Sequence, residues 1–305
     1  MSQSKFVQSA DGTRIYASAQ GNASNTALVF VHGFSSDNTV FNDIFTKAEN
    51  TSEFFLVRYD LRGAGRSGKP TSADSYASKR FAEDFAAVAQ AFHLQKPVLV
   101  GWSMGALTVN DILTYLPAGT LSGAACISSF PCFTPDFIAA FNPVVGALRA
   151  GLFSTDVATV ELTSVALSRV ILLRSASPSP NFLEETARAL EHGTDFADDN
   201  LAVTWETRSR IFGTSWFTHA VQRQHLSTRP HDSTSTVAAG KAGFPFLVIL
   251  GEKDAMLDSQ KFKGVVKGVS ASARVEVLAG GSHAPFLDAP EEVLGWIFSF
   301  AKGLV

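Results

Sequence analysis

The sequence contains little cysteine, few charges and no long hydrophobic run. Only Cys126 and Cys132 occur among 305 residues, too few for a disulfide framework and without the spacing of metal ligands. A net charge of -3 gives no basic field for nucleic acid or an anionic membrane. No apolar run could span a bilayer, and Met1 to Gln8 is polar, without a signal-like hydrophobic region. These absences predict a cytoplasmic protein with reduced thiols, which binds a small molecule and no nucleic acid.

Apolar residues, by contrast, make up 46% of the chain, which is enough to bury a large core. Short apolar runs alternate with helical patterns in both terminal parts of the sequence, which is typical of a mostly parallel sheet with helices on both faces. The first two runs flank Asp11-Gly12, a dipeptide that favours a tight hairpin turn. We therefore expect an α/β fold with a mainly eight-stranded sheet, in a monomer or a homodimer.

One stretch combines a strand, a sharp turn and a helix. Pro97 to Val100 is apolar and β-branched, and Gly101-Trp102-Ser103-Met104-Gly105 leads directly into an amphipathic segment, Leu107 to Leu116. A turn of this kind forces the serine into a strained conformation that exposes its hydroxyl, and the two glycines leave space where strand and helix approach each other. The Gly-x-Ser-x-Gly pattern in this context predicts a nucleophile elbow at Ser103.

The alternation of strands and helices stops in the middle of the chain. Residues 130–235 show helical patterns without a convincing strand, which predicts a helical cap inserted into a core formed by residues 1–129 and 236–305. The expected helices of the cap are Phe137 to Leu152, Val157 to Leu173, Phe182 to Leu190 and Leu201 to Gln224.

Three predicted strands end in residues that could form one catalytic site. The elbow strand ends at Ser103, the strand Phe244 to Leu250 is followed by Asp254, and the strand Ala273 to Leu278 is followed by His283. In an open parallel sheet, the loops beyond the carboxyl ends of the strands line a common crevice. The three side chains can therefore meet, although they are far apart in the sequence.

These features together resemble the α/β-hydrolase fold superfamily: the order Ser103, Asp254, His283, the elbow itself, the His32-Gly33-Phe34 loop and the glycine-rich segment Asp60 to Gly68. The resemblance covers most of residues 1–129 and 237–305, and the insertion corresponds to the variable cap of that family. Two departures are Ala106, where many relatives have a second glycine, and a short His-Gly-x loop in place of a glycine run. The resemblance implies Phe34 as donor of one oxyanion-hole amide.

The three groups suit nucleophilic catalysis without a cofactor or a metal. A serine hydroxyl must lose its proton as it attacks, and neutral His283 is a suitable acceptor. Asp254 would hold the imidazole in the correct tautomer. The main-chain amides of Met104 and Phe34 would form the oxyanion hole. We expect an acyl-enzyme on Ser103 and cleavage of a carboxylic ester, lactone or thioester of a small, hydrophobic substrate.

Several residues have a second interpretation. Asp258 is an alternative carboxylate to Asp254, although Asp254 directly follows the strand. His32 is expected to brace its loop. Three further histidines are six residues apart, a spacing that does not match the ligands of a zinc module. A stripe of phenylalanines at the start of the insertion could line an acyl pocket, but such stripes more often serve packing. The histidines are His219, His225 and His231, and the phenylalanines are Phe130, Phe133, Phe137 and Phe141.

The glycine-rich loop from Asp60 lacks the ending of a phosphate-binding loop, so nucleotide binding is disfavoured.

Two other functions are compatible with the same motifs. A C–C bond hydrolase or lyase could use the same triad, because fold does not decide function. A small-molecule receptor of the same fold, with little turnover, is the alternative from a different class of protein.

Overall fold

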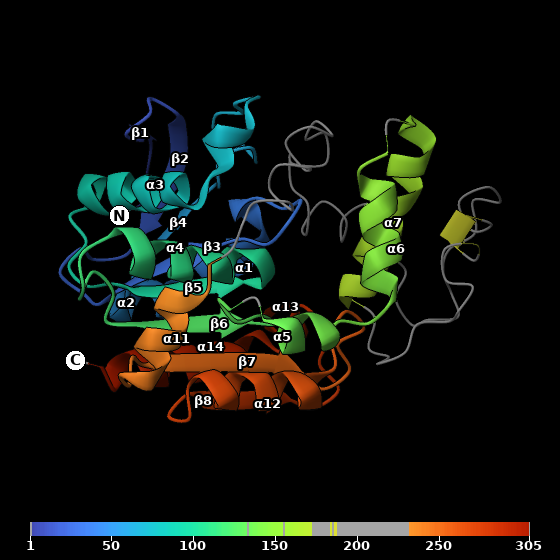
Figure 1. Ribbon diagram of the computed structural model, residues 1–305. Coiled ribbons are helices and arrows are strands. Elements are labelled where there is room, and N and C mark those ends of the chain that lie inside the picture. The colour runs from blue at the N-terminus through green and yellow to red at the C-terminus, as the bar shows by residue number, and fades with distance from the viewer. Residues whose placement is uncertain are drawn as a thin grey trace.

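A computed structural model describes residues 2–132, 134–154, 156–172, 184, 186–187 and 232–304. Its centre is an eight-stranded sheet with the strand order β1-β2-β4-β3-β5-β6-β7-β8 (Figure 1). The expected mostly parallel, eight-stranded architecture is confirmed. The strands are β1 Ser2–Gln8, β2 Arg14–Gln20, β3 Ala27–Val31, β4 Phe55–Tyr59, β5 Val98–Trp102, β6 Gly123–Ile127, β7 Phe246–Gly251 and β8 Arg274–Leu278.

The first two strands form the predicted antiparallel hairpin. Gly12 has φ +82° in the turn, a left-handed conformation that glycine adopts without steric strain. Strand β1 pairs only with β2, and β2 pairs antiparallel with β4. The remaining pairs, from β4 through β3 and β5 to β8, are parallel. All six parallel strands therefore direct their carboxyl ends to one edge of the sheet.

Both faces of the parallel strands are buried, which explains their continuous apolar runs. In β3, Val29 and Val31 belong to one core cluster, and Leu28 and Phe30 belong to the other. Helices α3, α4 and α12 contribute to the first cluster, and α1 and α14 contribute to the second. The helices of the core are α1 Asn42–Thr46, α2 Ala48–Glu53, α3 Ser78–Ala91, α4 Leu107–Tyr115, α11 Thr234–Lys241, α12 Ser259–Val269, α13 Pro285–Asp288 and α14 Pro290–Lys302.

Three described helices lie between β6 and α11 in the sequence: α5 Pro135–Ala139, α6 Val144–Leu152 and α7 Val157–Leu172. Helices α6 and α7 extend beyond the carboxyl edge of the sheet (Figure 1). They pack closely at Gly151, where an added Cβ would lie 2.1 Å from Thr163 Oγ1. The predicted helices at Phe182 to Leu190 and Leu201 to Gln224 lie essentially outside the described residues, as do Phe133 and His219, His225 and His231.

The expectation of one continuous helix from Phe137 to Leu152 is wrong. The chain leaves α5 after Ala139 and enters α6 only at Val144. Between them, Phe141 forms an isolated bridge with Leu257, and the Asn142 amide donates to Met256 O at 2.9 Å. Pro143 also disfavours helical geometry at Asn142. Contacts with a segment more than 100 positions later in the sequence thus replace the local helix.

No helix in the described ranges is both long and apolar enough to cross a lipid bilayer.

A buried ion-pair network ties the loop after β4 to α3. Arg62 has a side chain that is 0% exposed, and it donates two hydrogen bonds to Asp84, at 2.8 and 2.6 Å. A third bond, of 2.8 Å, joins Arg62 to Asp11 beside the hairpin turn. Two charges removed from water are stable only while they neutralise each other. The network therefore fixes the hairpin, the loop and α3 relative to one another.

Replacing Asp84 by leucine is expected to lower the free energy of unfolding by about 3–5 kcal/mol, because the Arg62 guanidinium would stay buried without its main partner. Urea denaturation followed by circular dichroism measures the loss. The double variant Arg62→Met/Asp84→Leu should regain most of the stability, since it removes both charges. Glu291→Gln, which breaks an exposed pair with Lys47, is the matched control and should change little. A single variant as stable as this control would contradict the interpretation.

Candidate active site

The turn after β5 has the geometry predicted for a nucleophile elbow. Ser103 follows the last residue of the strand and has φ +51°, an uncommon conformation for a non-glycine residue. Residues Ser103–Ala106 form a 3₁₀ turn that leads into α4. The strain predicted for Ser103 is confirmed, and its hydroxyl lines a pocket.

Glycines provide the space around this turn. A Cβ on Gly101 would lie 2.5 Å from Ala106 Cα, and a Cβ on Gly105 would lie 2.2 Å from Val31 O. On the other side, a Cβ on Gly33 would lie 3.2 Å from Ser103 Cβ. The elbow is thus pressed against β3 and against the loop that follows it. Ala106 is accommodated in place of the second glycine of many relatives.

Substituting Gly105 by alanine is expected to lower the free energy of unfolding by about 3 kcal/mol, because the new methyl group overlaps the backbone of β3. Gly295→Ala is the matched control. Gly295 lies exposed in α14 with no atom near its would-be Cβ, so the control should raise stability by about 0.5–1 kcal/mol. Thermal denaturation of both variants measures the difference. Equal stability of the two variants would show that the elbow tolerates a side chain at this position.

Ser103, His283 and Asp254 form one hydrogen-bonded chain. His283 Nε2 lies 3.1 Å from Ser103 Oγ, and His283 Nδ1 lies 2.7 Å from Asp254 Oδ2. An ionised carboxylate only accepts hydrogen bonds, so Nδ1 carries the ring proton and Nε2 accepts from the serine hydroxyl. His283 and Asp254 are both about 1% exposed. The structure therefore brings together the three residues that the sequence analysis selected.

Backbone hydrogen bonds join the loops that hold Asp254 and His283. The Glu252 amide donates to Leu278 O at 2.9 Å, and the Lys253 amide donates to Gly281 O at 2.8 Å. A Cβ on Gly251 would lie 2.0 Å from Ser282 O, so this close approach requires glycine. The two loops are thus fixed side by side at the carboxyl ends of β7 and β8.

Asp254 and Asp258 have different environments. Asp254 Oδ1 accepts from the amides of Met256 and Leu257 at 2.8 and 3.3 Å, which leaves Oδ2 directed at the histidine. Asp258 instead caps α12, accepting from the amides of Gln260 and Lys261 at 3.0 Å. The hydrogen bond from the Lys261 amide lowers the pKa of Asp258. Of these two carboxylates, only Asp254 contacts the His283 imidazole.

Two further groups hold the backbone of His283. The Trp102 indole donates from Nε1 to His283 O at 2.9 Å, and Trp102 is buried. The His283 amide donates to Ile171 O at 3.1 Å, near the end of α7. The histidine loop is thus bonded both to the elbow strand and to α7. Neither contact could be inferred from the sequence, because a backbone carbonyl leaves no sequence signal.

His32 braces the loop that follows β3, as expected. Its Nδ1 lies 2.8 Å from Gly33 O, and its Nε2 accepts from the Leu61 amide at 3.0 Å. The neighbouring Asp60 is buried, which raises its pKa, and it accepts from the backbone amides of Asn38 and Arg66 at 2.8 Å. The glycine-rich segment from Asp60 thus supports the loop around Phe34.

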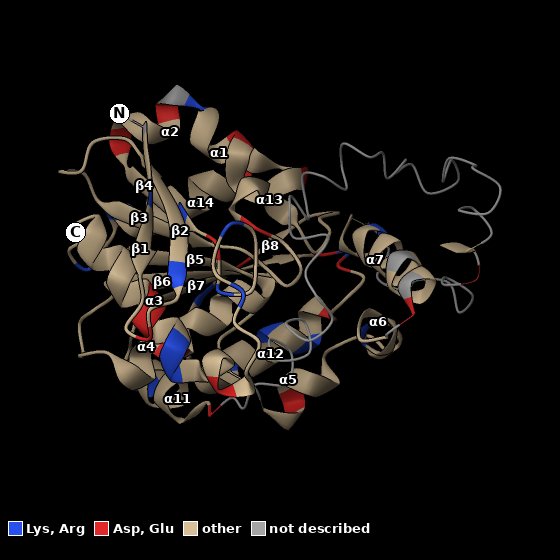
Figure 2. Cartoon of the chain, turned by 90° about the horizontal axis from the view of Figure 1, so that it is seen from above, with Lys and Arg blue, Asp and Glu red and all other residues tan. Residues whose placement is uncertain are grey.

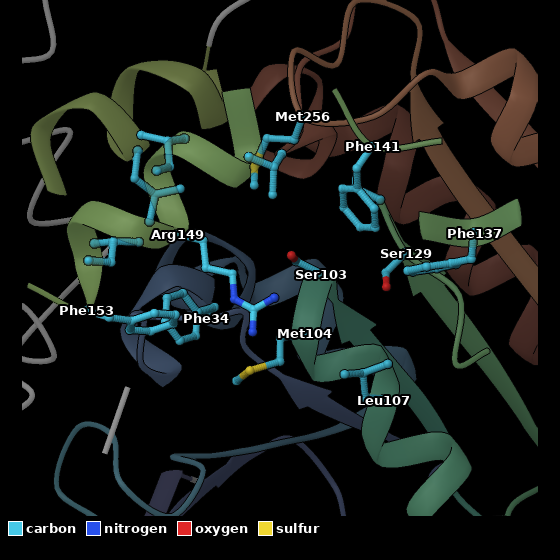
Figure 3. A pocket seen from close by; sticks show the side chains of 15 residues that line it. Phe34, Ser103, Met104, Leu107, Ser129, Phe137, Phe141, Arg149, Phe153 and Met256 are labelled. Carbon is cyan, nitrogen blue, oxygen red and sulfur yellow. The ribbon is translucent and has the colours of Figure 1, made fainter. Parts of the chain in front are cut away.

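A pocket of about 210 Å³ opens above Ser103 (Figure 3). The described residues of its walls are mainly apolar and come from the core, from α5 to α7 and from the loop after Asp254. Burial of the reacting carbonyl in such a pocket would exclude water from the oxyanion. The lining residues are Phe34, Ser103, Met104, Leu107, Ser128, Ser129, Phe137, Phe141, Val145, Leu148, Arg149, Leu152, Phe153, Leu167 and Met256.

The pocket contains residues that the sequence pattern did not predict. Phe137 and Phe141 do line the cavity, whereas Phe130 packs against Phe246 in the core with ring centroids 5.0 Å apart. Ser129 could have been found, because it follows β6, a neighbour of the elbow strand, at the carboxyl edge. Arg149 gave no such signal, since an arginine in an amphipathic helix is ordinarily assigned to the solvent face.

Comparison with known proteins identifies the family. The model of the alpha/beta hydrolase family matches residues 28–296, which is most of the sequence. The chain therefore belongs to the alpha/beta hydrolase family.

Individual relatives are distant or match over a short segment. A pimeloyl-[acyl-carrier protein] methyl ester esterase of Edwardsiella ictaluri is 24% identical, with 90% of this chain and 93% of the relative covered. "Probable oxidoreductase EphD" of Mycobacterium tuberculosis is 36% identical over 97 residues, but the match spans only 16% of that relative's length and 32% of this chain. The crystal structure of the esterase RhEst1 from Rhodococcus sp. ECU1013 superimposes with a TM-score of 0.78 at 22% identity, covering 99% of both chains. At that identity the likeness shows the fold alone.

Proposed function

We propose that this protein is a serine hydrolase that cleaves a carboxylic ester, lactone or thioester of a small substrate through an acyl-enzyme on Ser103. The observation that supports the proposal most strongly is the continuous chain from Asp254 through His283 to Ser103 beneath an apolar pocket. The esterase activity named for the relatives from Edwardsiella and Rhodococcus agrees with it. A strained serine with a hydrogen-bonded base is the arrangement that activates a weak nucleophile.

In the first half of the reaction, Ser103 Oγ attacks the carbonyl carbon while its proton passes to His283 Nε2. The tetrahedral intermediate collapses, the bond to the leaving oxygen or sulfur breaks, and the imidazolium returns the proton to the leaving group. In the second half, water loses a proton to His283 and attacks the acyl carbon. The acid is released, and Ser103 recovers its proton.

The amides of Phe34 and Met104 are proposed as the oxyanion hole. Met104 directly follows the nucleophile in the 3₁₀ turn, and Phe34 follows Gly33, which is pressed against Ser103. Both residues line the pocket. A donor of this kind is typically worth about 3 kcal/mol of transition-state stabilisation.

The division into a core of residues 1–129 and 236–305 and a cap of residues 130–235 is also proposed. It is supported by α5 to α7, which follow β6 and supply much of the pocket wall. Because the Ile171 carbonyl accepts from the His283 amide, a shift of α7 would act directly on the catalytic base. The cap would then control both substrate choice and the geometry of the triad.

Steady-state turnover tests the proposal. The purified protein is assayed with short-chain, long-chain, cyclic and thio-linked acyl substrates, and the acid released per protein molecule is counted. Many turnovers with at least one of these classes are expected. A single burst that leaves a lasting adduct on Ser103 would instead identify a receptor with little turnover. Activity on C–C bonds alone would identify the lyase or C–C hydrolase alternative.

A further inference from the structure

The pocket above Ser103 contains one charged side chain among its described lining residues. Arg149 lies in α6, where it is the only charged residue, and α6 and α7 have few charges altogether (Figure 2). Its guanidinium points into the cavity toward the side where Ser103, Phe34 and Met104 lie (Figure 3). Arg149 is solvent-accessible, so a ligand entering the pocket can reach it.

No described acidic residue neutralises this arginine. The ion pairs of the described residues do not include Arg149. A cation–π contact places its guanidinium carbon 5.9 Å from the centre of the Phe153 ring. The described part of the pocket wall holds no carboxylate, and its other polar side chains are serine hydroxyls. Arg149 also lies in the last turn of α6, where a cation is favourable for the helix dipole, and this position does not prevent its guanidinium from binding an anion in the cavity.

A guanidinium among apolar walls is suited to an anion. It offers a planar set of donors that matches the two oxygens of a carboxylate. In a mainly apolar pocket, a few polar groups fix the orientation of the ligand.

Resting on the proposed hydrolase function, we propose that Arg149 binds a carboxylate on the substrate, which is therefore an ester with a second, anionic group. The carboxylate pairs with Arg149 while the ester carbonyl lies at Ser103. The apolar wall around Phe137 and Phe153 then packs against the uncharged part of the molecule. Arg149 is thus a specificity-determining residue, and the reaction leaves its charge unchanged.

Kinetics with matched substrates tests this. Monomethyl esters of dicarboxylic acids, from succinic to suberic, are compared with the same esters in which a carboxamide replaces the free carboxylate. Acetyl esters of hydroxy acids and of their amides form a second series, which places the carboxylate on the alcohol side. The wild-type protein should prefer the acid over the amide by about tenfold in kcat/KM in one of the two series. The preference should arise mainly in KM, since the ion pair forms in both ground and transition states.

Variants at Arg149 test whether the acid-to-amide ratio depends on the charge of this side chain or on its shape. Arg149→Gln should reduce the acid-to-amide ratio to about one, Arg149→Glu should invert it, and Arg149→Lys should restore part of it. Arg274→Gln is the control for loss of a positive charge, because Arg274 lies at the start of the edge strand β8 and pairs with Glu276. This control should keep the wild-type ratio. An acid-to-amide ratio that is unchanged in Arg149→Gln would overturn the inference while leaving the hydrolase function in place. A wild-type protein without any preference for the acid would do the same.

A binding measurement keeps the two proposals distinguishable. In the Ser103→Ala background, calorimetry compares binding of the monomethyl esters with and without Arg149→Gln. Arg149-dependent binding without any turnover by the wild-type protein would support the inference and refute the hydrolase function. Turnover of these esters by the wild-type protein, with binding that does not depend on Arg149, would support the hydrolase function and refute the inference about Arg149.

Discussion

Replacement of Ser103 by alanine is expected to abolish acyl transfer, lowering kcat by about a million-fold, by analogy with the serine nucleophile of proteases. The alanine removes the only oxygen within hydrogen-bond distance of His283 Nε2 among the described side chains. The fold should be retained, because the change removes one oxygen at a pocket wall and creates no clash.

The measurement is steady-state hydrolysis of the best ester found for the wild-type protein, with circular dichroism as a check on folding. Ser270→Ala is the matched control: Ser270 is buried at the end of α12, away from the pocket, and its loss should leave turnover unaffected. An Ser103→Ala protein that turns over at the wild-type rate would mean that another residue is the nucleophile. Labelling by a serine-reactive phosphonate, followed by mass spectrometry, should modify Ser103 in the wild type.

Replacement of Asp254 by asparagine is expected to lower kcat by about ten-thousand-fold, as for the aspartate of a serine protease triad. The structure gives a specific reason. The amides of Met256 and Leu257 both need an acceptor, so the asparagine carbonyl takes the place of Oδ1. Its NH₂ group then faces His283 Nδ1 as a donor. The ring proton is forced onto Nε2, which can no longer accept the proton of Ser103.

Asp258→Asn is the matched control, because an asparagine caps a helix about as well as an aspartate. Its turnover should equal that of the wild type, whereas Asp254→Asn should lose turnover with nearly unchanged KM. Comparison of kcat for the two variants under the same conditions checks this. A larger loss for Asp258→Asn than for Asp254→Asn would transfer the orienting role to the other carboxylate.

Much of the core could be predicted from the sequence, because its signals are local. The buried strands are continuous apolar runs, since each is covered on both faces, and the hairpin turn requires the positive φ of Gly12. The elbow could be recognised because a strained serine needs glycines on both sides. The order of Ser103, Asp254 and His283 followed from the positions at which strands end.

The region after β6 was harder to predict because its contacts are long-range. The helical pattern from Phe137 to Leu152 is genuine, but Asn142 bonds to the backbone of Met256 and Ala255, which ends the first helix early. The same contact brings Met256 to the pocket wall. Periodicity along the chain holds no information about such partners.

The sequence by itself determined the class of fold, the elbow and the three residues that could meet at one edge of the sheet, because spacing along a strand or helix fixes which face a side chain occupies. The tertiary structure alone decided that Asp254, and not Asp258, contacts His283, that α7 bonds to the histidine loop, and that Arg149 faces Ser103. These outcomes depend on how segments distant in sequence pack together, and packing is a property of the whole core.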